Sequence, residues 1–112
     1  MKRVYVCGSF KFIDKIEDLE KLLKAAGVEF VASKSLDPRG ISGCLEKIDQ
    51  ADVVYVVNPD GYVGKSVSVD IGYAYARKKP IYLMYPTDDP PIMDLVKDVL
   101  TFEQLVDIAK NR

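Results

Sequence analysis

The stretch that decides the fold is NPDGYVGKSVSVDIGYAYARKKP, residues 58–80. It follows the apolar run Asp52–Val57 (DVVYVV) and precedes a second one, Pro80–Tyr85 (PIYLMY). Its first part, through Lys65, is rich in glycine and predicts a loop. From about Ser66 to Lys78 the apolar residues recur at helical spacing. The stretch therefore predicts a strand, a loop, a helix and a second strand that is parallel to the first.

The same alternation continues on both sides of this unit. Further strands are predicted at Arg3–Cys7 and Val28–Ala32, and further helices from Ile13 to Gly27 and over Ile41–Gln50. After the proline-rich loop Pro86–Pro91 and a short apolar segment, Thr101 with Gln104 predicts a capping box that starts a last helix. Alternating strands and short-looped helices are typical of an α/β fold. We expect one domain over residues 1–112, a three-layer sandwich whose flavodoxin-like or Rossmann-like parallel sheet has four or five strands and helices on both faces.

In such sheets, ligands bind beyond the carboxyl ends of the strands. That rule selects three loops as the candidate site: Gly8–Phe12, Leu36–Gly40 and Asn58–Ser66.

Composition excludes several classes of function. The chain has 112 residues, 48% of them hydrophobic, and a net charge of −1 with a pI near 5.4. No basic excess is available to drive binding to nucleic acid or to acidic membranes. No apolar run approaches the roughly 20 residues that span a bilayer, and the amino-terminal run is shorter than the apolar core of a signal peptide. We therefore expect a cytoplasmic protein with reduced cysteines.

The chain contains no histidine and two cysteines. Ser-His-Asp and Cys-His nucleophilic machinery and histidine-ligated metals are thereby excluded, and two cysteines alone do not make a zinc site. No metal or other cofactor is expected.

The segment GYVGKS superficially resembles a phosphate-binding loop. A Walker A loop needs a glycine five residues before the glycine of its GK pair, and here that position is Pro59. A GxGxxG dinucleotide fingerprint is also absent. A glycine-rich turn before a helix can still bind an anion through its backbone N–H groups. The structural alternative is that Gly61 and Gly64 turn the chain, Ser66 caps the helix and Lys65 is a solvated charge.

Asp70 follows this loop among apolar residues. An acid in the first turn of a helix is favoured by the helix dipole, so Asp70 has a structural explanation that requires no chemistry.

Three segments resemble the nucleoside 2-deoxyribosyltransferase superfamily, which includes the 2′-deoxynucleoside 5′-phosphate N-hydrolases. They are VYVCGSF at Val4–Phe10, ADVVYVV at Ala51–Val57 and VDIGYAYARKKPIYL at Val69–Leu83. The resemblance covers nearly the whole chain and implies a parallel α/β sandwich. The opening VYVCGS is similar to the N-hydrolase branch.

The resemblance also implies roles for individual residues. Asp70 corresponds to the family's nucleophilic glutamate, which attacks the anomeric carbon of 2-deoxyribose, and Tyr5 to a tyrosine that contacts it. At a helix N-terminus, Asp70 would be kept ionised. The predicted substrate-binding residues include Ser9 and Lys11, which match the 5′-phosphate site, together with Gly8, Asn58, Gly64 and Ser66. Both residues also have structural explanations: Ser9 as a turn residue and Lys11 as a solvated charge.

Two residues depart from the family pattern. Asp70 is one methylene shorter than glutamate, which withdraws the carboxylate by roughly 1 Å. Cys44 stands where the family has an aspartate that handles the base, and its place on an apolar helical stripe favours a buried core cysteine. A further aspartate of the transferases corresponds to Gly64.

These observations predict an enzyme that cleaves or transfers at the N-glycosidic bond of a 2′-deoxynucleoside or its 5′-monophosphate. Hydrolysis is favoured over base exchange, because the opening strand is similar to the N-hydrolase branch and because Gly64 stands where the transferases have a further aspartate. The alternatives are a nucleoside- or nucleotide-binding module that has lost efficient catalysis, and a scaffolding protein with no nucleotide affinity. The expected partners are the small-molecule nucleoside or nucleotide and, by resemblance, further copies of the chain in a dimer or tetramer.

Overall fold

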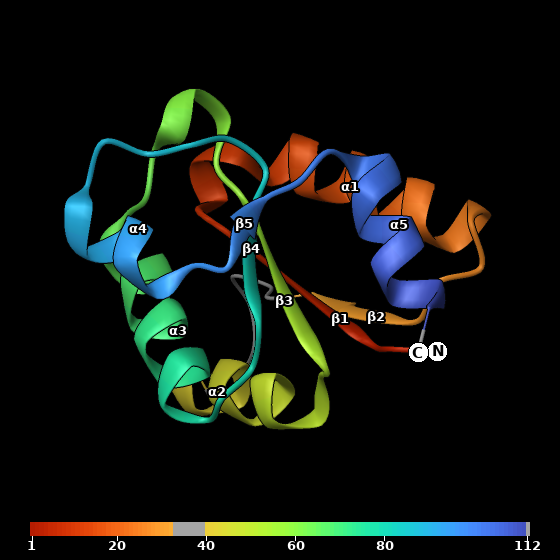
Figure 1. Ribbon diagram of the computed structural model, residues 1–112, viewed down its shortest axis with the longest axis horizontal. Coiled ribbons are helices and arrows are strands. Elements are labelled where there is room, and N and C mark those ends of the chain that lie inside the picture. The colour runs from red at the N-terminus through yellow and green to blue at the C-terminus, as the bar shows by residue number, and fades with distance from the viewer. Residues whose placement is uncertain (33–39, 112) are drawn as a thin grey trace.

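A single sheet of parallel strands organises the computed structural model, which describes residues 1–32 and 40–111 (Figure 1). Its strands, in the described residues, are β1 (Val4–Gly8), β2 (Phe30–Ala32), β3 (Val53–Val57), β4 (Ile81–Leu83) and β5 (Asp98–Val99). The helices are α1 (Ile13–Ala25), α2 (Ile41–Gln50), α3 (Lys65–Ala76), α4 (Pro90–Leu95) and α5 (Phe102–Lys110). Short 3₁₀ turns at Phe10–Phe12 and Pro59–Gly61 follow β1 and β3.

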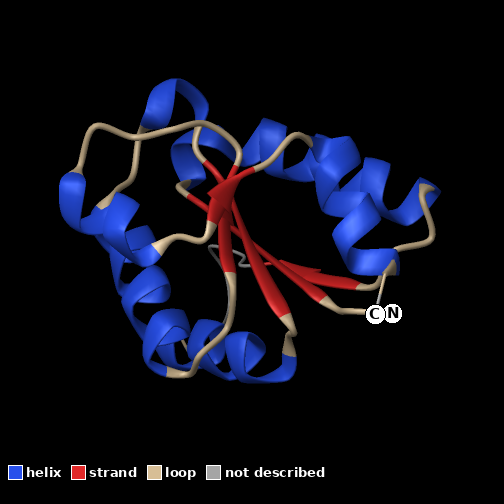
Figure 2. Ribbon diagram, in the orientation of Figure 1, coloured by secondary structure: helices blue, strands red, loops and turns tan. Residues whose placement is uncertain are grey.

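Helices cover both faces of the sheet, and Figure 2 shows the strands between the two helical layers. Successive side chains of a strand point to opposite faces, so each face receives alternate residues of the buried strands. On one face, Val4 and Val6 pack with residues of α1 and α5. On the other, Tyr5 and Cys7 lie in a cluster with residues of α2, α3 and α4. The predicted three-layer α/β sandwich is confirmed.

The strand order is β2-β1-β3-β4-β5, the order of flavodoxin-like folds. The chain moves from β1 outward to β2 and then returns to place β3 on the other side of β1. Register aligns the ends of the two central strands, with Cys7 opposite Val56 and Gly8 opposite Val57. In this topology a ligand-binding crevice is expected where the order reverses, at the carboxyl ends of β1 and β3.

The structure differs from the sequence-based expectation near the carboxyl end. The predicted loop Pro86–Pro91 already contains the start of α4, at Pro90. Proline is favoured in the first turn of a helix because the N–H that it lacks has no partner there. The short segment after α4 adds β5 to the sheet edge, so the sheet has five strands in the described residues.

Two other boundaries also differ. The strand predicted at Val28 begins at Phe30. Helix α3 begins at Lys65, and its N-cap is Gly64. The prediction that Ser66 caps this helix is therefore wrong.

Of the predicted loop Leu36–Gly40, residues 36–39 lie outside the described part of the chain. Among the described residues, no helix has both the length and the apolar character needed to cross a lipid bilayer.

Candidate active site

Asp70 lies on the buried side of α3, where only 4% of its surface is exposed. Val67, Ile71 and Ala74 are buried on the same side of the helix and pack against the sheet. Because α3 begins at Lys65, Asp70 lies in the second turn, and the expectation that it occupies the first turn is wrong. The helix dipole acts mainly within the first turn. It therefore does not account for a carboxylate at this depth.

Two side chains of β1 donate hydrogen bonds to one oxygen of Asp70. The hydroxyl of Tyr5 lies 3.2 Å from Oδ2, and the thiol Sγ of Cys7 lies 3.3 Å from the same atom. Tyr5 and Cys7 are alternate residues of the strand, so both point toward α3. Within the described residues, Oδ1 of Asp70 is buried and has no hydrogen-bond partner. The carboxylate thus has one oxygen held by the protein and one without a partner.

The structure brings together Tyr5 and Asp70, two residues that the family resemblance associates. Cys7, by contrast, was not predicted as a site residue. The available signal was its place two residues after Tyr5 in a buried strand, which puts both side chains on one face. A cysteine in an apolar run usually indicates core packing, and the sequence gives no sign that Asp70 lies opposite it.

Burial and hydrogen bonding act on the Asp70 carboxyl in opposite directions. Desolvation raises its pKa, while the hydrogen bonds from Cys7 and Tyr5 lower it, and the net shift is upward. The helix N-terminus, which was predicted to favour the ionised form, is not among the causes of this shift. That role falls to the two donors from β1. Burial raises the pKa of Cys7 well above its usual value, and the neighbouring charge of Asp70 raises it further, so Cys7 remains a protonated donor.

The raised pKa of Asp70 predicts a specific dependence of stability on pH. Between its unfolded pKa, about 3.9, and its higher folded pKa, the folded protein binds more protons than the unfolded chain does. The free energy of unfolding contributed by this group therefore falls as pH rises through that window, and the loss persists above it. We expect Asp70→Asn to remove this contribution and to raise the melting temperature at pH 7 more than at pH 4. Thermal melts of the wild type and of Asp70→Asn at the two pH values measure this. An equal change in melting temperature at pH 4 and at pH 7 would contradict the prediction.

A second tyrosine–aspartate pair outside the site provides a contrast. Tyr73 of α3 donates to Oδ2 of Asp49 at 2.7 Å, and Nε of Arg77 donates to Oδ1 at 2.8 Å. Both oxygens of Asp49 are occupied, and its pKa is lowered, chiefly by the hydrogen bond from Tyr73. An exposed and fully paired carboxylate of this kind links α2 to α3. Asp70 differs in both its burial and its unpaired oxygen.

The loop after β1 begins with a close approach of the backbone. A Cβ atom on Gly8 would lie 2.9 Å from Cδ1 of Ile16 and 3.0 Å from the carbonyl oxygen of Val57, so glycine allows α1 to approach the end of the sheet. Ser9 caps the following 3₁₀ turn, and its Oγ accepts a hydrogen bond from the backbone N–H of Lys11 at 3.3 Å. The Lys11 amine lies 4.7 Å from the centre of the Tyr62 ring, a cation–π distance.

Asn58, at the end of β3, is completely buried. Its Nδ2 donates to the carbonyl of Tyr85 at 2.7 Å, and its Oδ1 accepts from the Tyr85 N–H at 2.9 Å. These bonds join the loop after β3 to the segment after β4. Asn58 therefore has a structural role, because its buried side chain holds these two segments together. Gly64 is the N-cap of α3, and Ser66 is an exposed residue of its first turn.

A pocket of about 460 Å³ opens between the segments that follow β1, β3 and β4. Lys11, Phe12 and Tyr62 line one part of it, and the rings of Phe12 and Tyr62 meet edge to face. Three aspartates also line the pocket: Asp60, Asp88 and Asp89. Of the predicted site residues, Lys11 thus lines a polar pocket at the carboxyl end of the sheet, which acidic residues also line, whereas Ser9, Tyr5 and Asp70 are not among its lining residues.

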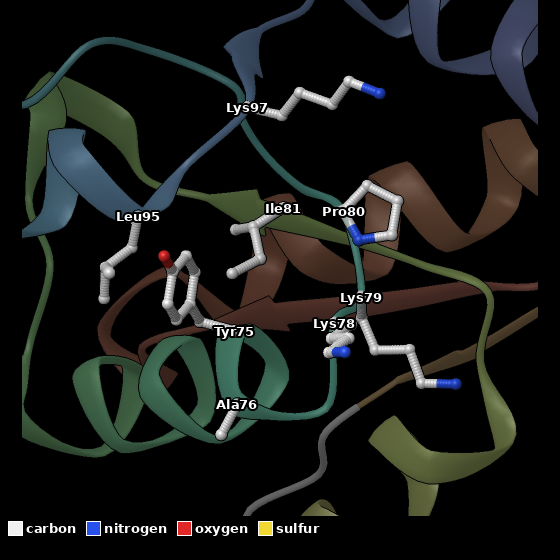
Figure 3. A pocket seen from close by; sticks show the side chains of 8 residues that line it. All are labelled: Tyr75, Ala76, Lys78, Lys79, Pro80, Ile81, Leu95 and Lys97. Atoms are coloured by element: carbon white, nitrogen blue, oxygen red, sulfur yellow. The ribbon is translucent and has the colours of Figure 1, made fainter.

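A larger pocket, of about 610 Å³, lies at the opposite end of the sheet, where α3 ends and β4 begins (Figure 3). Tyr75, Ile81 and Leu95 are among its lining residues. In Figure 3 the amines of Lys79 and Lys97 point away from the Tyr75 ring. Neither Asp70 nor its hydrogen-bond donors Tyr5 and Cys7 line this pocket, so size alone does not identify the site.

Cys44, on α2, is half-buried, which corrects the prediction of a buried core cysteine. Cys44 is close enough to Cys7 to interact with it electrostatically, in the direction that raises the pKa of Cys7. Cys44 therefore belongs to the surroundings of Cys7 and Asp70.

Comparison with known proteins supports the fold. No family model and no curated protein sequence matches the chain. Among solved structures, a 2-deoxyribosyltransferase from Bacillus psychrosaccharolyticus is similar over 98% of this chain and 92% of its own, with a TM-score of 0.70 and 17% identity. A conserved protein from Enterococcus faecalis V583 is similar over 98% of both chains, with a TM-score of 0.69 and 15% identity.

A CMP N-glycosidase from Clostridium botulinum is similar over 96% of this chain and 97% of its own, with a TM-score of 0.59 and 20% identity. These structures share the fold of the chain along almost its whole length. The resemblance to the deoxyribosyltransferase superfamily is thereby supported at the level of the fold.

Proposed function

We propose that the protein hydrolyses the N-glycosidic bond of a 2′-deoxynucleoside or its 5′-monophosphate, with Asp70 as the nucleophile. The observation that carries the proposal is the state of the Asp70 carboxylate. One oxygen is held by Tyr5 and Cys7, and the other is buried and unpaired within the described residues. A buried unpaired carboxylate oxygen is costly, and such a cost is retained mainly where it serves chemistry. The carboxylate also lies beside β1, next to the reversal of strand order where ligands bind.

The chemistry proceeds in two displacements. Oδ1 of Asp70 forms a bond to the anomeric carbon while the bond from that carbon to the base nitrogen breaks. The base leaves with the bonding electron pair and takes up a proton from water. A water molecule then attacks the same carbon, loses a proton to solvent and releases the sugar, which regenerates the carboxylate. Tyr5 orients the nucleophile throughout.

Two features support hydrolysis as the outcome. The opening strand Val4–Gly8 is similar in sequence to the hydrolase branch, and the position of the transferases' further aspartate is Gly64, a backbone cap without a side chain. The charged residues of the polar pocket do not distinguish a 2′-deoxynucleoside from its 5′-monophosphate, so the proposal includes both substrates. Lys11 favours a 5′-phosphate, whereas Asp60, Asp88 and Asp89 oppose a doubly charged anion. The predicted homo-oligomer and cytoplasmic location stay predictions.

The deciding experiment is a prolonged incubation of the purified protein with each 2′-deoxynucleoside and each 2′-deoxynucleoside 5′-monophosphate. Released base is separated by chromatography, and parallel reactions contain a second free base as a possible acceptor. Hydrolysis yields free base and free sugar, whereas transfer yields a new nucleoside. Asp70→Asn, purified identically, excludes a contaminating enzyme. Base release of equal rate in the two proteins would contradict the proposal.

A second candidate is a nucleoside- or nucleotide-binding module of the same fold with lost catalysis. Its supporting observation is the depth of Asp70, whose exposed fraction is 4% and whose pKa is raised, so that the nucleophile is both shielded and less readily ionised. A binder would show no base release, but its melting temperature would rise with nucleotide concentration. Asp70→Asn would leave that stabilisation intact.

A further inference from the structure

The hydrogen bonds around Asp70 distinguish its two oxygens. Tyr5 and Cys7 are both fully buried, and both approach Oδ2, at 3.2 Å and 3.3 Å. They belong to the central strand β1, which is paired on both sides, so their positions are fixed by the rigid part of the sheet. A carboxylate held through one oxygen by two donors cannot rotate freely about its terminal bond. Its second oxygen therefore keeps a defined direction.

We propose that Cys7 is a positioning residue for Asp70: together with Tyr5 it holds Oδ2, so that Oδ1 is the oxygen that attacks the substrate. This inference rests on the proposed function for its last step, while the hold on Oδ2 is a property of the folded protein. It assigns to a residue of β1 a role beyond core packing. Cys7 does not touch the reacting carbon and acts through Asp70.

Protonation of the thiol is consistent with this role. Burial and the charge of Asp70 raise the pKa of Cys7. The thiol therefore keeps the hydrogen that it donates. A thiolate nucleophile at this position would require the opposite shift. Since the hydrogen bond from Cys7 favours the ionised carboxylate, its removal raises the pKa of Asp70.

Three variants separate positioning from packing. Cys7→Ala removes the donor, and Cys7→Ser retains a donor on a shorter side chain. Val6→Ala is the matched control, because Val6 is equally buried on the same strand but points to the opposite face, among residues of α1 and α5. It loosens the core without touching Asp70. Urea unfolding of all three variants establishes that each is folded under the assay conditions.

The first readout is the pH dependence of base release. With Cys7→Ala, we expect kcat at neutral pH to fall about tenfold, the equivalent of one net hydrogen bond, with KM nearly unchanged. The acid limb of the profile should move to higher pH. Cys7→Ser should restore part of both effects, and Val6→Ala should leave the acid limb in place. Equal losses in Cys7→Ala and Val6→Ala with an unmoved acid limb would overturn the inference.

The second readout requires no catalysis. The carboxyl carbon of Asp70, identified by its absence from the spectrum of Asp70→Asn, is titrated by NMR in each variant. A pKa that rises in Cys7→Ala and stays constant in Val6→Ala supports the hold on Oδ2, even if no substrate is turned over and the proposed function fails. A pKa unchanged in Cys7→Ala overturns the inference, even if the wild-type protein is an active hydrolase.

Discussion

Asp70→Asn is expected to lower the rate of base release by about 10³-fold or more, because an amide oxygen is a far weaker nucleophile than a carboxylate. The substitution preserves the shape of the side chain. Tyr5 and Cys7 can still donate to the amide oxygen that replaces Oδ2, so the side chain at position 70 should keep its orientation. The loss should therefore appear in kcat, while substrate still raises the melting temperature of the variant. Single-turnover assays and ligand-dependent thermal melts measure the two effects.

Asp49→Asn is the matched control for this experiment. Asp49 also accepts a hydrogen bond from a tyrosine, Tyr73, and it also contacts α3, but it is exposed and its side-chain partners are on α3 and at its end. Its replacement removes a carboxylate of the same chemical type and should leave the rate of base release within about twofold of wild type, as expected for an exposed surface pair. A loss of similar size in Asp49→Asn and Asp70→Asn would show that charge or stability is responsible, and the nucleophilic role would be rejected.

Gly61→Ala is expected to destabilise the protein by about 3 kcal/mol or more. Gly61 has a φ of 75°, a left-handed conformation that costs about 1–2 kcal/mol for a residue with a Cβ atom. In addition, that Cβ atom would lie 2.6 Å from the carbonyl oxygen of Pro86, which is backbone and cannot rotate away. The two loops that line the polar pocket would have to separate. A fall in melting temperature of about 10 °C is expected for a protein of this size.

Gly27→Ala separates the two causes. Gly27 has nearly the same φ, 74°, but no atom of another described residue, apart from its chain neighbours, lies within 4 Å of a Cβ built on it. Its replacement measures the conformational cost alone, about 1–2 kcal/mol. The difference between the two variants, obtained from urea unfolding, is the cost of the clash with Pro86. If Gly27→Ala and Gly61→Ala proved equally destabilising, the clash with Pro86 would have no cost, and the prediction for Gly61→Ala would be contradicted.

The central strands and the helices between them could be predicted because burial on both faces leaves a continuous apolar run, as in Val53–Val57. The strand at the edge of the sheet could not be predicted in this way. Strand β5 contains only Asp98 and Val99, too few residues for a pattern, and it pairs with β4 only after α4 has turned the chain. The start of α4 at Pro90 was hidden for a different reason. Proline is equally compatible with a loop and with a helix's first turn.

The candidate site was predictable only in part. The resemblance associated Tyr5 with Asp70, and the fold places them in contact. Cys7 was missed because an apolar strand pattern predicts burial and cannot show which group lies across from each side chain. The apolar spacing predicts a start of α3 at about Ser66, one residue too late, and thereby assigns Asp70 to the first turn, where the helix dipole acts. Its actual environment, a desolvated carboxylate with two donors on one oxygen, depends on tertiary packing.

The paired hydrogen bonds between Asn58 and Tyr85 have a consequence for amide hydrogen exchange. Because the Asn58 side chain accepts from the Tyr85 N–H and donates to the Tyr85 carbonyl, it substitutes for the backbone of a neighbouring strand beyond the end of β4. The amide hydrogen of Tyr85 should therefore exchange with solvent as slowly as that of Met84, which donates to the Val56 carbonyl within the sheet. In Asn58→Ala, exchange at Tyr85 should accelerate to the rate of an open loop while Met84 stays protected. One buried asparagine thus extends the cooperative unit of the sheet into the segment that carries the far wall of the polar pocket.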